Sequence, residues 1–366
     1  MSSKSGYPQD KPVNILEGRD LKALAKYIKS ESCKNVFLMV IRLLTTSAGI
    51  PDFRSPETGL YANLARLNLP YPEAVFQIDF FRRNPIPFYT LAKELYPGRY
   101  RPTITHSFIK LLHSHSLLHT CFTQNIDTLE RRAGVPGNKI IEAHGSFATQ
   151  RCIDCQKPYD DEKIKQAVMK SEIPRCEHCE GLVKPDIVFF GEALPRKFHL
   201  SIPSLRHADL LIVMGTSLTV HPFASLVTLV PQDCPRVLIN LDDVGHFNRR
   251  SDIVYLRKCD EVVRELCQEL GWEEELDKEW KATENTVEGG VETSDNRPAE
   301  EADDEVAKIT RAVEESLSVS EPKSGGLDDA SPQRSDEGNS DEITPQPGSP
   351  KESESAISSS SQDGKL

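Results

Sequence analysis

The sequence contains no long hydrophobic run. None of its apolar stretches approaches the roughly 18 consecutive residues that a membrane-spanning helix needs, although 38% of the 366 residues are hydrophobic. No basic N-terminal segment followed by an apolar core is present, so nothing indicates a secretory signal or a transit peptide. These two absences argue against a membrane protein or a secreted protein.

Aromatic residues are rare, and acidic residues frequent, toward the C-terminal end. Residues 273–366 carry 26 of the 56 acidic and 9 of the 44 basic residues, a balance of −17, whereas residues 1–272 carry +5. The segment cannot bury enough apolar surface to offset its chain entropy, so we expect a disordered acidic tail over residues 283–366. Its candidate sites for proline-directed kinases, which can equally be chance pairs in a solubilising tail, are Ser331-Pro332, Thr344-Pro345 and Ser349-Pro350.

Four of the nine cysteines have the spacing of a structural zinc ribbon. Two Cys-x2-Cys pairs are separated by twenty residues, and each pair can present two thiolates to one cation. Four sulfurs leave no open coordination position, so we expect one structural zinc ion outside the chemistry. The alternative is four unrelated buried cysteines. The expected ligands are Cys152, Cys155, Cys176 and Cys179.

The part of the chain before the tail alternates between short apolar runs and amphipathic segments. Short apolar runs are typical of buried strands, and apolar residues at every third or fourth position are typical of helices. The alternation predicts an α/β fold with a Rossmann-like, doubly wound parallel sheet. The expected strands are Val36–Ile41, Leu117–Thr123, Asp209–Met214, Arg236–Leu241 and Asp252–Leu256, and the expected helices are Leu21–Ile28, Ile104–His113 and Glu261–Leu270.

Two insertions interrupt the expected sheet. Residues 55–100 contain several aromatic residues and prolines, which favour a short helical module with an apolar face. Residues 145–185 contain the four cysteines and predict a zinc module. We expect the two insertions to form a small second domain within a catalytic domain that spans residues 15–282.

Small and polar residues follow the expected strands, at the edge where such sheets bind ligands. The run from Thr46 to Pro56 reads TSAGIPDFRSP, and its small residues would let backbone N–H groups approach a phosphate. An ordinary turn with a surface salt bridge is the alternative. The run Gln124-Asn125-Ile126-Asp127 can hold ribose hydroxyls and a carboxamide, but capping of the next helix by Asn125 or Asp127 explains it equally well.

A histidine stands at a further strand end, next to a glycine. An unperturbed imidazole titrates near pH 6.5, so His144 suits proton abstraction from a hydroxyl. The histidines at 113, 115 and 119 are better explained as surface or helix residues. The apolar run Val188–Glu192 predicts either an interior strand or an edge that accepts an extended peptide. Gly215–Ser217 offers donors to a phosphate or a ribose.

Taken together and in this order, these segments resemble the sirtuins, a family of NAD-dependent protein-lysine deacylases. The resemblance runs from about Leu21 to Gly271 and is greatest to class I members of the cytoplasmic type, with a fungal-like tail. The joint match is far more specific than any single motif. The matching segments are TSAGIPDFRSP, TQNID, HGS, the four cysteines, KPDIVFFGE, GTSL and INLD.

The resemblance implies a role for each matching residue. His144 would be the general base acting through the ribose hydroxyls, and Asn125 would take part in catalysis with it. The acyl-lysine peptide would be bound between two domains by Val188, Phe189, Gly191 and Glu192. NAD would be bound by Ala48, Asp52, Phe53, Arg54, Gln124, Asn125, Ile126, Asp127, Gly215, Thr216, Ser217, Asn240, Asp242 and Cys259.

The implied reaction is deacetylation of lysine in proteins. The acyl oxygen attacks the ribose carbon that carries nicotinamide, and His144 then helps a ribose hydroxyl to attack, giving free lysine and O-acetyl-ADP-ribose. The implied partners are acetylated proteins, such as histones or cytoplasmic proteins, without direct nucleic-acid or membrane binding. The five cysteines outside the zinc pattern are scattered, which is typical of free thiols in a reducing compartment. We expect a cytoplasmic protein, with shuttling to the nucleus left open.

One segment departs from the family pattern. Where sirtuins have Gly-Ala-Gly-Ile-Ser, this chain has Ile41-Arg42-Leu43-Leu44-Thr45. Side chains at Ile41 and Leu43 should clash with the approach of the backbone to the phosphates of NAD. Three explanations are open: a weak or inactive binding protein that keeps the fold, compensation by Arg42, and a misread exon boundary. We favour the last because every other motif is intact, and an NAD-dependent ADP-ribosyltransferase is a less favoured alternative.

Overall fold

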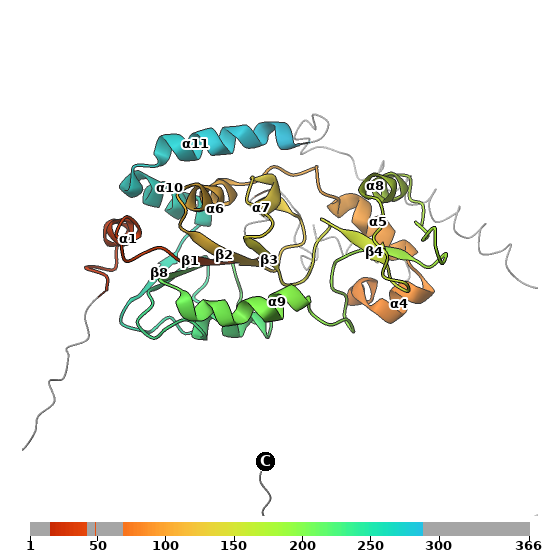
Figure 1. Ribbon diagram of the computed structural model, residues 1–366, viewed down its shortest axis with the longest axis horizontal. Coiled ribbons are helices and arrows are strands. Elements are labelled where there is room, and N and C mark those ends of the chain that lie inside the picture. The colour runs from red at the N-terminus through yellow and green to blue at the C-terminus, as the bar shows by residue number, and fades with distance from the viewer. Residues whose placement is uncertain (1–14, 42–47, 49–68, 288–366) are drawn as a thin grey trace, which may run out of the picture. The chain divides into compact units, whose positions relative to one another are not determined.

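The computed structural model describes residues 15–41, 48 and 69–287. These residues form a six-stranded parallel sheet in the order β3-β2-β1-β6-β7-β8 and a two-stranded antiparallel sheet, β4-β5 (Figure 1). The strand order reverses between β1 and β6, as in a doubly wound sheet. The strands are β1 Val36–Val40, β2 Leu118–Thr123, β3 Ile140–Glu142, β4 Gln150–Cys152, β5 Val183–Pro185, β6 Leu210–Met214, β7 Arg236–Asn240 and β8 Asp252–Leu256.

Alternate residues of β1 supply two separate hydrophobic cores. Val36 and Leu38 belong to one cluster of buried residues and Phe37 and Met39 to the other, because successive side chains of a strand point to opposite faces. Helices cover both faces of the sheet (Figure 1). The first core contains residues of α1 Leu21–Ile28, α6 Ile104–Ser114, α10 Cys259–Leu270 and α11 Glu273–Ala282, and the second contains residues of α9 Arg196–Ser201, η3 Ile202–His207 and η4 Phe223–Thr228.

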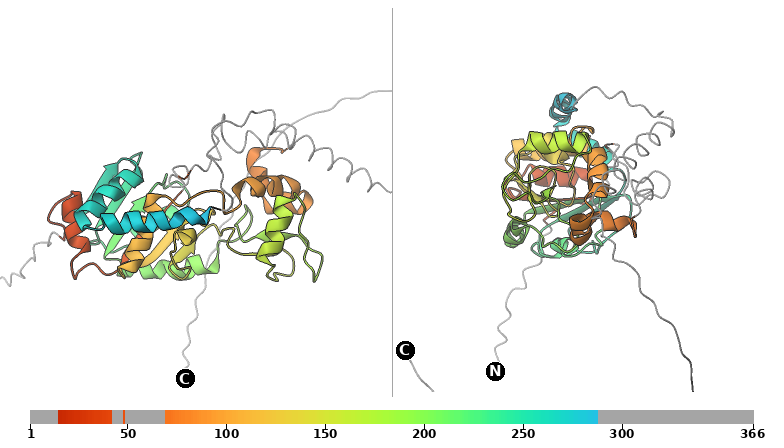
Figure 2. Two further views of the ribbon diagram at one scale, coloured as in Figure 1. Left: turned by 90° about the horizontal axis from the view of Figure 1, so that it is seen from above. Right: turned by 90° about the vertical axis from the view of Figure 1, so that its right-hand side faces the viewer.

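A third core joins the two insertions. It combines residues from the helical insertion with residues from β4, β5 and a helix of the zinc insertion, and Figure 2 shows these elements side by side. The phenol of Tyr89 donates a hydrogen bond to the carbonyl of Val183 on β5, which links the two insertions directly. The helical elements are η2 Pro72–Phe76, α4 Ile78–Arg83, α5 Ile86–Leu95 and α8 Asp161–Met169.

The fold class predicted from the sequence is confirmed. Each expected strand of the large sheet is present with its ends displaced by at most one residue, and the predicted helix Leu21–Ile28 is α1. The sequence did not predict β3, α8 or α11. In α11 only Leu276 is buried, so its apolar periodicity is weak. The strand expected at Val188–Glu192 is wrong, since only Phe190 forms a β-bridge there, with Gln77.

The ordered chain extends further toward the C-terminus than the sequence predicts. We expected disorder from residue 283, but Thr283–Thr286 forms the 3-10 turn η5, and Thr283 is 3% exposed. The Thr283 hydroxyl accepts a hydrogen bond from Arg101 Nε at 3.0 Å and donates one to the Trp280 carbonyl at 2.7 Å. The remainder of the expected tail lies outside the described residues. Within the described ranges, no helix is both long enough and apolar enough to cross a membrane.

A buried histidine stands in the first turn of α6. His106 is 0% exposed, and its Nδ1 accepts the backbone N–H of Thr103 at 3.1 Å. The ring hydrogen therefore sits on Nε2, which has no hydrogen-bond partner. Burial lowers the pKa of His106 to about 4, although the nearby Asp260 opposes the shift. The folded protein thus holds this imidazole neutral well below the pH at which the unfolded chain protonates it.

We predict that His106 makes the fold sensitive to acid. Between pH 6.5 and 4 the unfolded chain binds a proton at this position and the folded chain does not, so the free energy of unfolding falls as the pH falls. This group alone should remove up to about 3 kcal/mol over that range. Urea denaturation of the protein at several pH values, compared with His106→Gln, measures the effect. The exposed His199→Gln is the control, and equal pH slopes in the parent and His106→Gln would contradict the assignment.

Candidate functional site

The polar residues singled out in the sequence lie at the carboxyl edge of the large sheet. The segments that follow β2, β3, β6 and β7 all leave the sheet at this edge, because its strands are parallel. The order of the strands reverses between β1 and β6, which opens the crevice where ligands of such sheets bind. The topology therefore brings Gln124–Asp127, His144, Gly215–Ser217 and Asn240–Asp242 to one edge.

The segment after β2 is held in place by its backbone and leaves two amide groups unused. Gln124 N–H donates to the Val40 carbonyl at 3.2 Å, and Asn125 N–H donates to the Thr123 hydroxyl at 3.0 Å. The side-chain nitrogens Nε2 of Gln124 and Nδ2 of Asn125 are buried without a hydrogen-bond partner. An unpaired buried donor costs about 1–3 kcal/mol, so a ligand that supplies oxygen acceptors would be stabilised here. The hydroxyls and carboxamide of NAD fit that requirement.

The capping alternative for this segment is correct for Asp127. Its Oδ1 accepts the backbone N–H of Leu129 at 2.9 Å, at the start of the short helix α7 Leu129–Arg132. Asn125 makes no such contact with α7. Asp127 therefore contacts the start of α7, whereas ligand binding by Asn125 stays a prediction.

Carboxyl groups gather behind this segment. Burial, and the carboxyl of Glu130, raise the pKa of Asp127, although the backbone N–H of Leu129 opposes the shift. Burial raises the pKa of Glu130 as well, while the side chain of Thr123 opposes that shift. Of these three carboxyl groups, that of Glu142 accepts two hydrogen bonds from Arg131, at 2.8 and 2.7 Å. Among the described residues, no hydrogen bond to a basic side chain is seen for Asp127 or Glu130.

His144 follows β3 and is held neutral. Burial lowers its pKa, and a hydrogen bond to the backbone of Gln124 opposes the shift. One ring nitrogen thus contacts the segment after β2, and the other can accept a proton. His144 therefore shares an edge of the sheet with the unpaired amides of Gln124 and Asn125.

Gly145 lets the loop of His144 press against the chain that follows β5. Its φ is +65°, and a Cβ atom built there would lie 1.7 Å from the carbonyl oxygen of Asp186. The carbonyl of His144 accepts the backbone N–H of Val188 at 2.8 Å. Only glycine fits this approach, which joins the histidine to the segment expected to bind the peptide.

The ends of β6 and β7 are tied together by one side chain. Asn240 Oδ1 accepts the Thr216 N–H at 2.9 Å, and its Nδ2 donates to the carbonyls of Thr216 at 2.9 Å and Asp242 at 2.7 Å. Asn240 is 1% exposed, so it positions these loops rather than presenting its amide to a ligand. Ser217 and Asp242 are exposed and remain candidates for ligand contact.

Gly215 and Cys259 lie beside the hydrogen bonds of Asn240. Gly215 has a positive φ of 63°, and its N–H donates to the Ile239 carbonyl at 3.1 Å. The Cys259 thiol donates to the same carbonyl at 3.4 Å, and burial raises its pKa to about 12. Cys259 is therefore a neutral hydrogen-bond donor at neutral pH rather than a nucleophile.

The four residues expected to bind the peptide are not equivalent. Phe189 is 1% exposed and packs edge-to-face against Phe76, Phe81 and Phe88, so a substrate can meet only its backbone. Glu192 Oε2 accepts the Phe189 N–H at 2.8 Å and is already engaged. Val188 is partly buried and Gly191 is exposed. The remaining exposed side chain is Phe190, 62% exposed, which sequence reasoning missed.

Much of the expected nicotinamide side falls outside the described residues. Asp52, Phe53 and Arg54 lie there, as do Arg42, Leu43 and Leu44, so their expected roles stay predictions. Ala48 is partly buried and packs against the third core, as does Ile126. Ile41 is 7% exposed and belongs to the same core as Phe37 and Met39. Its side chain is therefore accommodated by the protein, and the clash expected with the phosphates of NAD stays a prediction.

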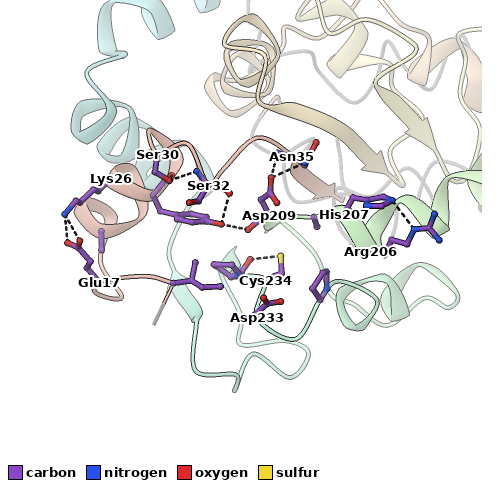
Figure 3. Close-up of a pocket in the computed structure, with 16 residues that line it drawn as sticks. Glu17, Lys26, Ser30, Ser32, Asn35, Arg206, His207, Asp209, Asp233 and Cys234 are labelled. Carbon is purple, nitrogen blue, oxygen red and sulfur yellow. Dashed lines mark hydrogen bonds and ion pairs between the residues drawn. The ribbon is translucent and has the colours of Figure 1, made fainter. Parts of the chain in front are cut away.

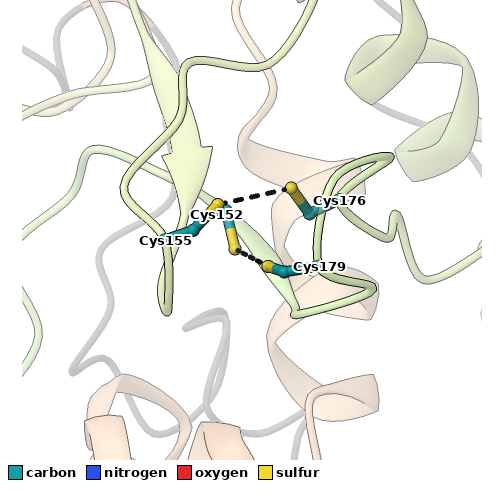
Figure 4. Close-up of side chains that lie close together, drawn as sticks. All are labelled: Cys152, Cys155, Cys176 and Cys179. Atoms are coloured by element: carbon teal, nitrogen blue, oxygen red, sulfur yellow. Dashed lines mark hydrogen bonds between the residues drawn. The ribbon is translucent and has the colours of Figure 1, made fainter.

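The four cysteines meet as the spacing predicts. Their sulfur atoms all lie within 4.8 Å of one another, with Cys152 and Cys179 3.4 Å apart and Cys155 and Cys176 3.6 Å apart (Figure 4). Tetrahedral zinc with bonds of about 2.3 Å separates its sulfurs by roughly 3.8 Å, which this cluster matches. Backbone N–H groups of residues 178 and 179 lower the pKa of Cys176, whereas the neighbouring sulfurs raise the pKa of Cys179. The cluster is positioned to bind one zinc ion.

The surroundings of the cysteines also fit a closed site. A Cβ atom at Gly181 would lie 2.9 Å from the sulfur of Cys152, so this position needs glycine. Asp154, between the first two cysteines, is 2.8 Å from Arg82 of α4. The knuckle is thus attached to the helical insertion, and its four sulfurs leave no position for a substrate.

A cavity of about 740 Å³ lies away from this site, between α1 and the loops that precede β6 and β7 (Figure 3). It is at the amino edge of the strands. Three of its charged groups are already engaged. The Asp209 carboxylate accepts the backbone N–H groups of Lys34 and Asn35 at 2.9 and 2.8 Å. Lys26 pairs with Glu17 at 2.6 Å. We therefore do not assign the function to this cavity.

Two charged residues of the site were missed because their burial is not visible in the sequence. Glu130 is 1% and Lys184 is 5% exposed, although both residue types are usually on the surface. The only sequence signal was position, since Glu130 follows the TQNID run closely and Lys184 begins the KPDIVFFGE run.

Comparison with known proteins gives consistent matches. The Sir2 family model matches residues 44–222. The NAD-dependent protein deacetylase hst2-1 of Emericella nidulans is 53% identical over 313 residues, 85% of this chain and 87% of the relative. The deacetylase hst2 of Schizosaccharomyces pombe is 52% identical over 72% of this chain and 80% of its own length. The deacetylase sirtuin-2 of Danio rerio is 45% identical over 84% of each chain.

We predict that Cys176→Ser removes the metal and destabilises the small domain. A serine hydroxyl does not replace the thiolate that completes the tetrahedron. Zinc content by atomic absorption should fall from one ion per chain to near zero, with a lower melting temperature. Cys33→Ser, a buried thiol outside the cluster, should keep its zinc. Normal stability of Cys176→Ser without bound metal would refute a structural role.

Proposed function

This chain belongs to the Sir2 family, and we propose that it is an NAD-dependent protein deacetylase that releases nicotinamide and O-acetyl-ADP-ribose. Its relatives at 45–53% identity carry the name NAD-dependent protein deacetylase. One observation of the site supports the proposal most directly. His144, held neutral, stands at the same sheet edge as the unpaired side-chain amides of Gln124 and Asn125.

The residues present fit NAD. The unpaired nitrogens of Gln124 and Asn125 would donate to the ribose and the carboxamide. Thr216, Ser217 and Asp242 would face the adenosine half, with Asn240 holding their loops in place. NAD supplies, when bound, the ribose carbon that receives the acyl oxygen as nicotinamide leaves.

His144 would act as the general base of the second step. The free ring nitrogen would take up the proton of a ribose hydroxyl, while the backbone of Gln124 would hold the other nitrogen. The lowered pKa keeps the ring in its basic form at neutral pH. The Val188 N–H bound to the His144 carbonyl would keep the base next to the acyl-lysine peptide.

The substrates are acetylated proteins, as the names of the relatives imply. We propose that they include histones or cytoplasmic proteins, and that the protein works in the cytoplasm. The Ser-Pro and Thr-Pro pairs after residue 330 would be substrates for proline-directed kinases. Each of these points goes beyond the chemistry of the site and rests on the sequence.

We predict that His144→Ala abolishes deacetylation without unfolding the protein. Loss of general-base catalysis typically costs about 10²–10⁴-fold in rate. Release of O-acetyl-ADP-ribose from an acetylated peptide measures the loss, with zinc content and melting temperature unchanged. In the parent, the acid limb of the pH–rate profile should have its midpoint below 6.5, because the imidazole must be neutral to act and its pKa is lowered.

His113→Ala, on α6, is the control for this change and should retain activity. Unchanged turnover in His144→Ala would remove the assignment. An acid limb centred above pH 6.5 would show that another group controls the protonation step.

We predict that the run at 41–43 weakens NAD binding. Restoring Gly-Ala-Gly by Ile41→Gly, Arg42→Ala and Leu43→Gly should raise the affinity at least about a hundredfold, the equivalent of two hydrogen bonds to phosphate. Isothermal titration calorimetry of the two full-length proteins measures the change. Equally tight binding by the unaltered chain would mean that Arg42 or its loop compensates. Binding only after restoration would mean that the chain as written is a scaffold or a misread product of an active gene.

A further inference from the structure

The segment from Ile187 to Phe190 is extended and has two edges. Along one edge, the Val188 N–H donates to the His144 carbonyl at 2.8 Å. The Phe190 N–H donates to the Phe76 carbonyl at 2.8 Å, and its carbonyl accepts the Ile78 N–H at 3.2 Å. This edge therefore joins the histidine loop to the helical insertion.

The other edge is occupied by two charged side chains. Backbone groups of successive residues in an extended chain point to opposite sides, so the Ile187 carbonyl and the Phe189 N–H lie on this second edge. Lys184 Nζ donates to the Ile187 carbonyl at 2.5 Å, and the Phe189 N–H donates to Glu192 Oε2 at 2.8 Å. Side chains thus take the place that a neighbouring strand would have.

Lys184 is the buried centre of this arrangement. Its side chain is 6% exposed, and Nζ is 3.1 Å from Glu192 Oε2, 3.1 Å from the Pro185 carbonyl and 4.4 Å from the centre of the Phe189 ring. With the Ile187 carbonyl, these contacts satisfy all three ammonium hydrogens. Burial lowers the pKa of Lys184, and the nearby carboxylate of Glu192, whose side chain is 31% exposed, opposes the shift.

We propose that Lys184 is a positioning residue for the acyl-lysine peptide. Acting through Glu192, it fixes the extended run 187–190 and the turn at 191–192 that together present Val188 and Gly191 to the substrate. The ring of Phe189 already holds this segment in the aromatic core. The Lys184–Glu192 pair therefore affects the backbone conformation of residues 187–192 rather than the packing of the Phe189 ring. The proposal rests on the deacetylase function, since it specifies how that site holds its substrate.

Two variants of the full-length protein separate charge from shape. Lys184→Met keeps the apolar stem and removes the donors, whereas Lys184→Arg keeps a charged donor. The affinity for a fluorescein-labelled acetyl-lysine peptide, measured by anisotropy, should fall roughly tenfold or more in Lys184→Met and recover in large part in Lys184→Arg. Lys170→Met, an exposed lysine in the same module, matches the change in net charge and should bind like the parent.

Further readouts distinguish positioning from general stability. In Lys184→Met the KM for peptide should rise while the KM for NAD, the zinc content and the melting temperature stay close to those of the parent. If Lys184→Met does not fold, Glu192→Gln breaks the same ion pair and should give the same selective loss of peptide affinity. The double variant should bind no more weakly than Lys184→Met alone, because both changes remove one interaction.

Peptide affinity that is unchanged in Lys184→Met and Glu192→Gln would overturn the proposal. Peptide affinity, NAD affinity and melting temperature that fall together would also overturn it, because the role would then be purely structural. The deacetylase function is tested separately. It would be excluded if neither the unaltered chain nor the chain with Gly-Ala-Gly restored released nicotinamide from NAD in the presence of an acetylated peptide. Direct peptide binding would still decide the role of Lys184 in that case.

Discussion

The arrangement of the site depends on one close approach, that of Gly145 to the carbonyl of Asp186. There is no room for a side chain between them, since a Cβ would lie 1.7 Å from that oxygen. This approach brings the loop of His144, which leaves the large sheet, against the chain that leaves β5 of the zinc module. The proposed base follows a strand of one sheet and the proposed peptide segment follows a strand of the other, so the zinc module would contribute to catalysis only by positioning that segment.

The elements that could be predicted from the sequence are those whose pattern of apolar residues matches the burial of their side chains in the structure. Strands such as Leu210–Met214 are continuous apolar runs because helices cover both faces. The zinc cluster followed from spacing, since a metal knuckle is local chemistry. β3 has only three residues, too few to show a period, although the position of His144 at a strand end was expected. α11 is mostly charged and is held by Leu276 and by Trp272 before it, which a pattern of surface residues does not reveal.

The parts that the sequence could not predict are contacts between distant residues. Lys184 and Glu130 carry charges, so their burial depends on the whole fold rather than on their neighbours in sequence. For Asn240 the residue was expected at the site, but its amide serves the protein backbone rather than a ligand. Phe189 likewise was expected to meet the peptide, and its ring fills the core instead. The sheet edge at which these residues lie was thus anticipated, whereas the contacts that their side chains make within the protein were not.

The three hydrogen bonds of Asn240 require both the oxygen and the nitrogen of its amide, so few other side chains could replace it. Its nitrogen faces two carbonyl oxygens, those of Thr216 and Asp242, and its oxygen faces one N–H. Deamidation to aspartate would replace that NH₂ group by an oxygen and leave the shape of the side chain intact. The new oxygen would then face the carbonyl oxygens of Thr216 and Asp242 with no hydrogen between them. The loops after β6 and β7 would then repel where they now attract. Deamidation of this one side chain would therefore separate the two loops that border the site, although the residue keeps its size and shape.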